Sequence, residues 1–170
     1  MKAKKKSLNQ ERGFLFLEVL ISAALISITF ITLLSIGFIS LNTSTSIRNT
    51  SRANALIREE FEAVRSFRDG STWGSGGVGA ASTGSSSPYH LSLNNSTNPP
   101  SWQLDTGTET VDEFTRKIVF DKVSRDPSTQ NIESTYNASH DDPNTRKITV
   151  TVSSTEKTYQ VVTYLTNWKP

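Results

Sequence analysis

Side chains that could bind a metal or catalyse a reaction are few, and they gather near residue 140. The richest group is the run His140-Asp141-Asp142-Pro143-Asn144. Carboxylate and amide oxygens of this kind suit Ca²⁺. The run lacks the spacing of an EF-hand loop and its closing glutamate. We therefore interpret it as a solvated turn and keep Asp141, Asp142 and Asn144 only as minor calcium candidates.

The rest of the chain offers little for catalysis. It has two histidines, His90 and His140, and no cysteine, so it has no thiol nucleophile, no disulfide framework and no thiolate zinc site. The glycine-rich segment GSGGVGAASTG does not end in Lys followed by Ser or Thr, as a phosphate-binding loop would. We expect a protein that is not an enzyme, that uses no cofactor and that holds no metal.

Glu18 is the residue whose type conflicts most with its surroundings. It lies in the apolar run FLFLEVLISAALISITFITLLSIGFISL, residues 14–41, which contains no other charge and no proline. As a helix with a rise of ~1.5 Å per residue, this run would extend about 42 Å, which exceeds the ~30 Å hydrocarbon core of a bilayer. A carboxylate inside such a span costs ~2.5 kcal/mol or more at the helix centre and usually marks a function.

Two simpler interpretations of the apolar run leave residues unexplained. A secretory signal peptide would begin with a basic region such as MKAKKK, but its apolar region is usually roughly 7–15 residues long and is followed by an A-x-A-like site. This run is longer, and no such site clearly follows it. A generic single-pass anchor oriented by the lysines explains the run, but it does not explain Gly13 and Glu18.

The basic charge of the chain is confined to its N-terminus. The whole chain has 18 Lys and Arg against 16 Asp and Glu. Residues 1–13 hold five bases and one acid, a charge of +4, which leaves 13 bases and 15 acids, or −2, in residues 14–170. A short basic segment of this kind gives no reason to infer a nucleic-acid partner.

The N-terminal pattern as a whole resembles the signal of type IV pilins and type II secretion pseudopilins. A basic leader, residues 1–13, ends in Gly13, and the apolar run then opens with Phe14 and carries Glu18 at its fifth position. The resemblance implies that a prepilin peptidase cleaves after Gly13 and that Phe14 becomes N-methylated. It also implies that Glu18 acts in assembly by meeting the Phe14 amine of another subunit. Many major pilins carry a proline midway along this helix, whereas here only Gly37 could soften it.

After the apolar run the chain turns polar, and its hydrophobic pattern changes. Residues 42–69 predict an amphipathic continuation of the helix, with Gly70 as its C-terminal cap. Residues 70–87, GSTWGSGGVGAASTGSSS, are rich in Gly and Ser, which favours a flexible linker or a variable loop that Trp73 could fix by packing. The apolar face of the helix comprises Ala53, Ile57, Phe61, Val64 and Phe67.

Residues 88–170 are expected to form a β-rich head domain. Alternating side chains predict a strand with Ile148, Val150 and Val152, joined by a short link to a strand with Tyr159, Val161 and Leu165. We expect about four antiparallel strands packed on the amphipathic helix, an α+β fold that the pilin resemblance also implies, with the tryptophans in the core. Further strands are predicted at Tyr89–Leu93, at Trp102–Leu104 and around Phe114, Ile118 and Phe120.

These features lead us to expect a structural subunit, a minor pilin or pseudopilin of a type IV pilus or type II secretion-like filament. The resemblance implies three partners, namely the prepilin peptidase, other pilin or pseudopilin subunits and the cytoplasmic membrane. A single span would hold the head outside the cytoplasm before the chain enters an extracellular or periplasmic filament. The alternative is a single-pass membrane-tethered surface binding module with a β-rich ectodomain. The sequence does not choose among secretion, adhesion, twitching and DNA uptake.

Overall fold

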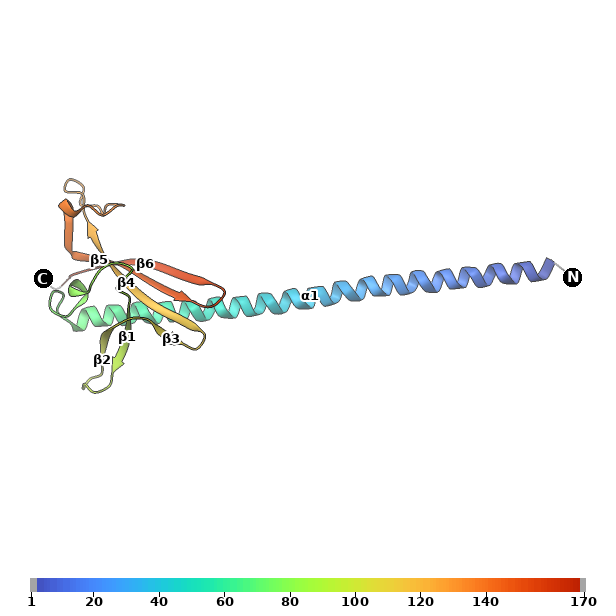
Figure 1. Ribbon diagram of the computed structural model, residues 1–170, viewed down its shortest axis with the longest axis horizontal. Helices are drawn as coiled ribbons and strands as arrows, with labels where there is room; N and C mark the ends of the chain where they lie inside the picture. Colours follow the sequence, from blue (N-terminus) through green and yellow to red (C-terminus); the bar gives the residue numbers. More distant parts are fainter. Residues whose placement is uncertain (1–2, 169–170) are drawn as a thin grey trace. The chain divides into compact units, whose positions relative to one another are not determined.

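The computed structural model describes residues 3–168, and for residues 3–13 it describes the helical backbone only. The chain divides into an N-terminal unit, Met1–Asn49, and a head unit, Thr50–Pro170. Helix α1 supplies the N-terminal unit and also residues 50–70 of the head unit (Figure 1). The elements are α1 (Ala3–Gly70), η1 (Val78–Ala80), β1 (Tyr89–Asn94), β2 (Ser101–Thr106), β3 (Glu109–Val111), β4 (Phe114–Ser124), η2 (Ala138–His140), β5 (Asp141–Ser153) and β6 (Thr158–Thr166).

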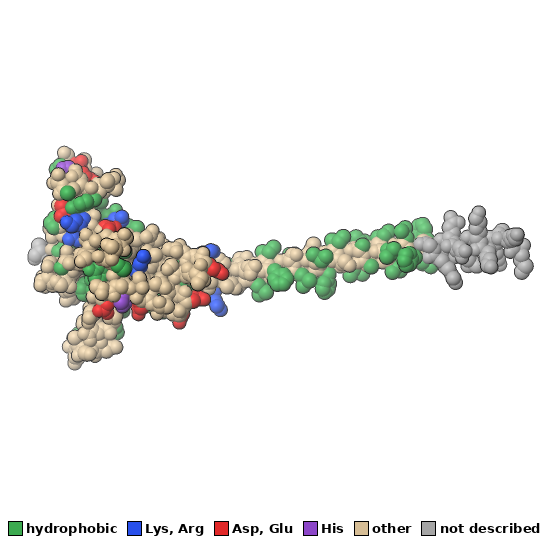
Figure 2. All heavy atoms as spheres, in the orientation of Figure 1, with side chains coloured by type: hydrophobic (Ala, Val, Ile, Leu, Met, Phe, Trp, Pro, Cys, Tyr) green, Lys and Arg blue, Asp and Glu red, His purple; other side chains and the backbone are tan. Residues whose placement is uncertain are grey.

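The N-terminal unit contains the apolar run, residues 14–41, as part of helix α1. The continuous helix predicted over residues 14–69 is confirmed. The large apolar side chains from Phe14 to Leu41 are exposed along it, and Figure 2 shows them in green. Four hydroxyl groups within the apolar run donate to backbone carbonyls three or four residues earlier, at 2.7–2.9 Å. These hydroxyls, on Ser27, Thr29, Thr32 and Ser35, therefore need no water to satisfy them.

The C-terminus of α1 closes differently from the prediction. Gly70 is the last residue of the helix, and it is not among the residues with positive φ, so it does not form a left-handed cap. Instead the hydroxyl of Ser71 donates a 2.7 Å hydrogen bond to the carbonyl of Phe67. That carbonyl is one of the last four of the helix, which have no partner within it.

The sheet of the head unit is antiparallel and has six strands in the order β2-β1-β4-β5-β6, with β3 beside β4. Long ladders join β4 to β5 and β5 to β6, whereas β1 pairs with β4 only at Tyr89 and Ile118. The β1–β2 hairpin is consequently a ribbon that diverges from the main sheet (Figure 1). The predicted α+β fold is confirmed, although about four strands were expected and the three-residue β3 was not predicted.

The core lies between the last part of α1 and one face of the sheet. The predicted helix face is confirmed, because Ala53, Ile57 and Val64 are buried and Phe61 and Phe67 pack against the same cluster. The prediction for β6 is wrong in part, since Val161 is 42% exposed on this edge strand. The buried apolar residues contributed by the strands are Tyr89, Leu91, Phe114, Ile118, Phe120, Ile148, Val150, Val152 and Leu165.

The Gly/Ser-rich segment 70–87 is packed on the head and is not a free linker. Val78 is fully buried, and the indole N–H of Trp73 donates to the carbonyl of Pro143 at 2.9 Å. A Cβ added at Gly79 would clash with Nε1 of Trp73, so only glycine fits against this ring. The expectation that Trp73 fixes the loop is confirmed. The expectation that all tryptophans are core residues is wrong for Trp168, which is 58% exposed.

Candidate functional site

The residues of the predicted processing and assembly signal lie at the start of the apolar run. Phe14 and Glu18 are both exposed, Phe14 to 74%, and their spacing of four residues places them on one side of α1. The backbone is helical at Gly13, whose surroundings lie outside the described part of the structure together with the other side chains of residues 1–13. The structure therefore shows where the predicted cleavage and assembly residues lie on α1, but it leaves their roles as predictions.

The apolar helix has the properties of a membrane span. Among the described residues, α1 is the one helix long and apolar enough to cross a membrane, with a mean hydropathy of 2.5 over its most apolar stretch and none of that stretch buried. Soluble monomers rarely expose so large a contiguous apolar surface. The surface between Phe14 and Leu41 is therefore compatible with a single-pass membrane anchor.

The calcium candidates are engaged in contacts with other protein groups. The carboxylate of Asp141 accepts a 3.0 Å bond from the hydroxyl of Tyr136. The carboxylate of Asp142 forms a 2.6 Å ion pair with Nε of Arg125. Within the described chain, no three His, Asp or Glu side chains are grouped so that they could hold a metal ion. The interpretation of this run as a simple turn is wrong in one respect, because strand β5 begins at Asp141.

Hydrogen bonding outweighs burial at Asp142. Burial acts to raise the pKa of its carboxyl group. Hydrogen bonds from the Thr145 hydroxyl, the Arg125 guanidinium and the backbone N–H of Asn144 act in the opposite direction, and the pKa is lowered overall. Asn144 is also held by its own side chain, whose oxygen accepts a 3.2 Å bond from the amide of Asn167. Hydrogen bonds from neighbouring protein groups thus stabilise the charged form of the Asp142 carboxylate.

A buried ion pair between α1 and the sheet was missed by sequence analysis. Glu60 is 1% exposed and Arg116 is 5% exposed, and Nε of Arg116 lies 3.2 Å from the Glu60 carboxylate. The other carboxylate oxygen of Glu60 accepts a 3.1 Å bond from the backbone N–H of Leu91. Arg116 also pairs with Glu109 at 2.6 Å and with Glu59 at 3.0 Å. Burial raises the pKa of Glu60, and the guanidinium only partly offsets this effect.

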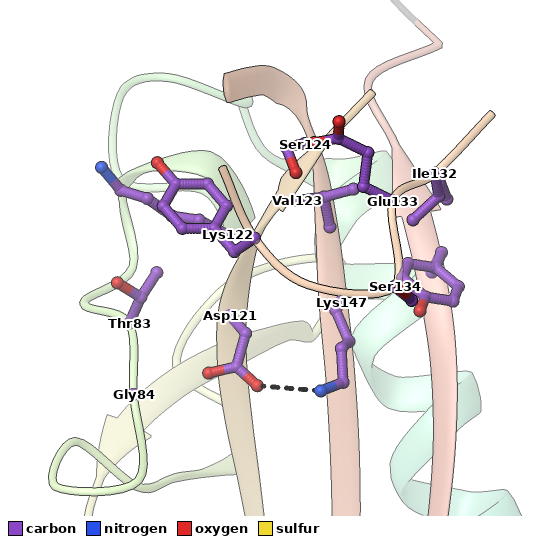
Figure 3. A pocket seen from close by; sticks show the side chains of 12 residues that line it. Thr83, Gly84, Asp121, Lys122, Val123, Ser124, Ile132, Glu133, Ser134 and Lys147 are labelled. Atoms are coloured by element: carbon purple, nitrogen blue, oxygen red, sulfur yellow. Dashed lines mark ion pairs between the residues drawn. The ribbon is translucent and has the colours of Figure 1, made fainter. Parts of the chain in front are cut away.

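A hollow of about 380 Å³ lies on the sheet face opposite the core, which we call the outer face. The ladder pairs Asp121 with Lys147 and Lys147 with Tyr164, so these three side chains form one row across β4, β5 and β6. They point away from the core because Phe120 and Ile148, the next residues along β4 and β5, point into it. Figure 3 shows Asp121 and Lys147 facing each other at the base of the hollow, with Nζ of Lys147 at 3.6 Å from the carboxylate.

The walls of the hollow are fixed by hydrogen bonds. On one side, the backbone N–H of Gly84 donates to the carbonyl of Phe120 at 2.9 Å, which holds the loop at Thr83 against β4. On the other side, the loop containing Glu133 is held because its backbone N–H donates to the Ser124 carbonyl at 2.9 Å. The Glu133 carboxylate lies 3.0 Å from Nδ1 of His140, and the Ser124 hydroxyl and His140 lower its pKa.

No family model, curated protein or solved structure matches this chain. The structure itself defines the class at the level of architecture. A long apolar N-terminal helix whose last part packs on an antiparallel sheet is a pilin-like architecture.

Proposed function

We propose that this chain is a structural subunit, a minor pilin or pseudopilin, of a type IV pilus or type II secretion-like filament. The observation that carries the proposal is helix α1, whose residues 14–41 are apolar and exposed on all sides and whose residues 50–70 are built into a folded head. A head anchored in this way can be held at a membrane and later drawn into a bundle of similar helices. The leader, Gly13, Phe14 and Glu18 supply the signals for processing and assembly that such a subunit needs.

Cleavage after Gly13 changes the charge of the helix end without shortening the apolar segment. It removes five of the chain's bases and leaves a new amine on Phe14, one helical turn before Glu18. In lipid there is little hydrophobic force between helices, so association depends on packing and on polar contacts. The serine and threonine hydroxyls that bind their own backbone add little to those contacts. Glu18 is consequently the main group that can set the register between neighbours, by pairing with the Phe14 amine of another subunit.

A membrane-tethered binding module remains the second candidate, and the hollow on the outer face is the feature that favours it. The two proposals differ at residue 13. A filament subunit loses its leader, whereas a tethered module keeps Met1. In the first case the head needs no ligand of its own, and in the second case the ligand is the function.

Intact mass of the chain, isolated from membranes of cells that contain a prepilin peptidase, tests the proposal. We expect loss of residues 1–13 and addition of one methyl group at Phe14. Gly13→Val should retain the leader, because a peptidase acting at this bond must bring its catalytic groups close to the backbone.

Gly37→Val is the matched control for this test. It introduces the same side chain into the same helix, at a position with nothing within 4 Å of an added Cβ, and it should be processed normally. Normal cleavage of Gly13→Val, or an intact Met1 in the wild type, would contradict the proposal.

A further inference from the structure

The hollow on the outer face combines aromatic rings with polar groups that can still bond to a ligand. Tyr136 and Tyr164 line it and are 43% and 45% exposed, so part of each ring is open to solvent. Asp121 and Lys147 lie 3.6 Å apart, which is longer than a good hydrogen bond. Both groups can therefore bond to a third group placed beside them, the carboxylate as an acceptor and the ammonium as a donor.

The charges in the hollow oppose the binding of a simple ion. Two lysines, Lys122 and Lys147, line it together with two acids, Asp121 and Glu133. An anion attracted by the lysines would approach the carboxylates, and a cation would approach the ammonium groups. A neutral ligand with many hydroxyl groups meets neither repulsion, and it can donate to Asp121 and accept from Lys147 at the same time.

A sugar ring fits this combination of surfaces. Its C–H groups form an apolar face that can stack on the exposed part of a tyrosine ring, and its hydroxyl groups lie at the edge, where they reach charged and hydroxyl side chains. Thr83 and Ser134 stand on opposite walls of the hollow and offer two further hydroxyls (Figure 3). The volume of about 380 Å³ is within the usual range for small-ligand sites.

The site is also formed in advance. The loop containing Ser134 is held by Glu133 and by a 2.9 Å bond from the backbone N–H of Asn137 to the hydroxyl of Ser124. The base of the hollow is formed by the paired strands β4, β5 and β6. A site of this kind loses little conformational entropy when it binds a ligand, which favours affinity.

We propose that the hollow around Asp121, Lys147 and Tyr164 binds a neutral saccharide. The aromatic contact is made by Tyr164, the edge hydroxyl groups are held by Asp121 and Lys147, and the loops at Thr83 and Ser134 enclose the ring. This activity goes beyond the role of the chain as a filament subunit and does not depend on it, because no group of the N-terminal unit takes part.

Titration calorimetry of the full chain with maltotriose, chitotriose and mannotriose tests the proposal. The protein is kept in lauryldimethylamine oxide, because a maltoside detergent would itself compete as a sugar. At least one trisaccharide should bind. Tyr164→Ala should weaken binding on the order of tenfold, whereas Tyr164→Phe, which keeps the ring, should stay within about twofold. Asp121→Asn should weaken it by about tenfold or more, because a charged acceptor is replaced.

Gln160→Ala is the matched control, since Gln160 lies on the same face of β6 as Tyr164 but outside the hollow. It should bind like the wild type, and circular dichroism should show all variants folded. The proposal is overturned if no trisaccharide binds with a Kd below about 10 mM. It is equally overturned if sodium sulfate binds more tightly than every trisaccharide, or if Gln160→Ala loses as much affinity as Tyr164→Ala.

Discussion

Replacing Arg116 with methionine should destabilise the head unit strongly at pH 7 and much less at pH 5. Methionine fills much of the buried space of the arginine stem but leaves the Glu60 carboxylate, 1% exposed, without its cation. Loss of one partner of a buried ion pair typically costs ~3–5 kcal/mol. The contacts of Arg116 with Glu59 and Glu109, whose side chains are 54% and 34% exposed, add ~1 kcal/mol or less each.

The free energy of protonating Glu60 sets an upper limit on how much its buried charge can destabilise the Arg116→Met variant. The carboxylate can bind a proton and so become neutral. At pH 7 this protonation costs about 3.4 kcal/mol of free energy for a group whose ordinary pKa is 4.5. At pH 5 the same step costs only about 0.7 kcal/mol. Because the substitution raises the folded-state pKa of Glu60 further, the stability that Glu60 provides is present below its ordinary pKa and is lost as the pH rises. The variant should therefore recover up to about 2.7 kcal/mol, relative to wild type, between pH 7 and pH 5.

Urea unfolding of the fragment from Thr43 to Pro170, followed by circular dichroism at both pH values, measures this difference. The double variant Glu60→Gln/Arg116→Met should lose the pH dependence, because the titrating group is gone. Arg52→Met is the matched control, since Arg52 pairs with Asp112 on the surface, and it should change stability by less than about 1 kcal/mol at either pH. Equal destabilisation by Arg116→Met at pH 5 and pH 7 would refute the reasoning and assign the effect to lost packing.

Three further outcomes are expected. Glu18→Val should leave membrane insertion and leader cleavage intact. It should reduce the amount of tagged chain recovered in sheared filaments relative to the membrane fraction. Equal recovery of the wild type and the variant would mean that Glu18 is only an interfacial residue. The fragment from Thr43 to Pro170 should be a folded monomer whose circular dichroism is unchanged by a chelator, and loss of structure would revive the calcium site. Asp142→Asn should cost ~1–2 kcal/mol at pH 7 in urea unfolding, because the three hydrogen bonds that the charged carboxylate accepts are weakened. The lowered pKa of Asp142 gives stability above its ordinary pKa that is lost as the pH falls, so the cost should disappear in acid; a constant cost would contradict this.

Local periodicity was enough to predict the main elements of this fold. The apolar run and the stripe from Ala53 to Phe67 give α1, and strict alternation gives β5, because each pattern reports which face of an element is buried. Such patterns do not show which strand lies at the edge of the sheet. Val161 alternates like a core residue, but β6 is an edge strand of the sheet that the described residues form, and this side chain is exposed.

The buried ion pair shows a signal that sequence analysis could have used. Glu60 lies three residues after Ile57 and four before Val64, in the middle of the helix stripe. Arg116 lies two residues before Ile118 on the inward face of β4. An acid in one core stripe and a base in another predict a buried pair. The hollow has no comparable signal, because Asp121 and Lys147 meet only through the register between β4 and β5.

The separation in sequence between the two halves of the core has a consequence for biosynthesis. Thr50 and Tyr159, whose hydroxyls lie 3.1 Å apart, are 109 positions apart, and Leu165 in the last strand closes the same core as Ile57. The helix leaves the ribosome before the strands, and the core around its apolar stripe is complete only when β6, which contains Leu165, has been made. Contacts of such long range are slow to form. The head unit therefore passes through a period in which part of this stripe is uncovered, and the fold cannot protect the stripe during that period.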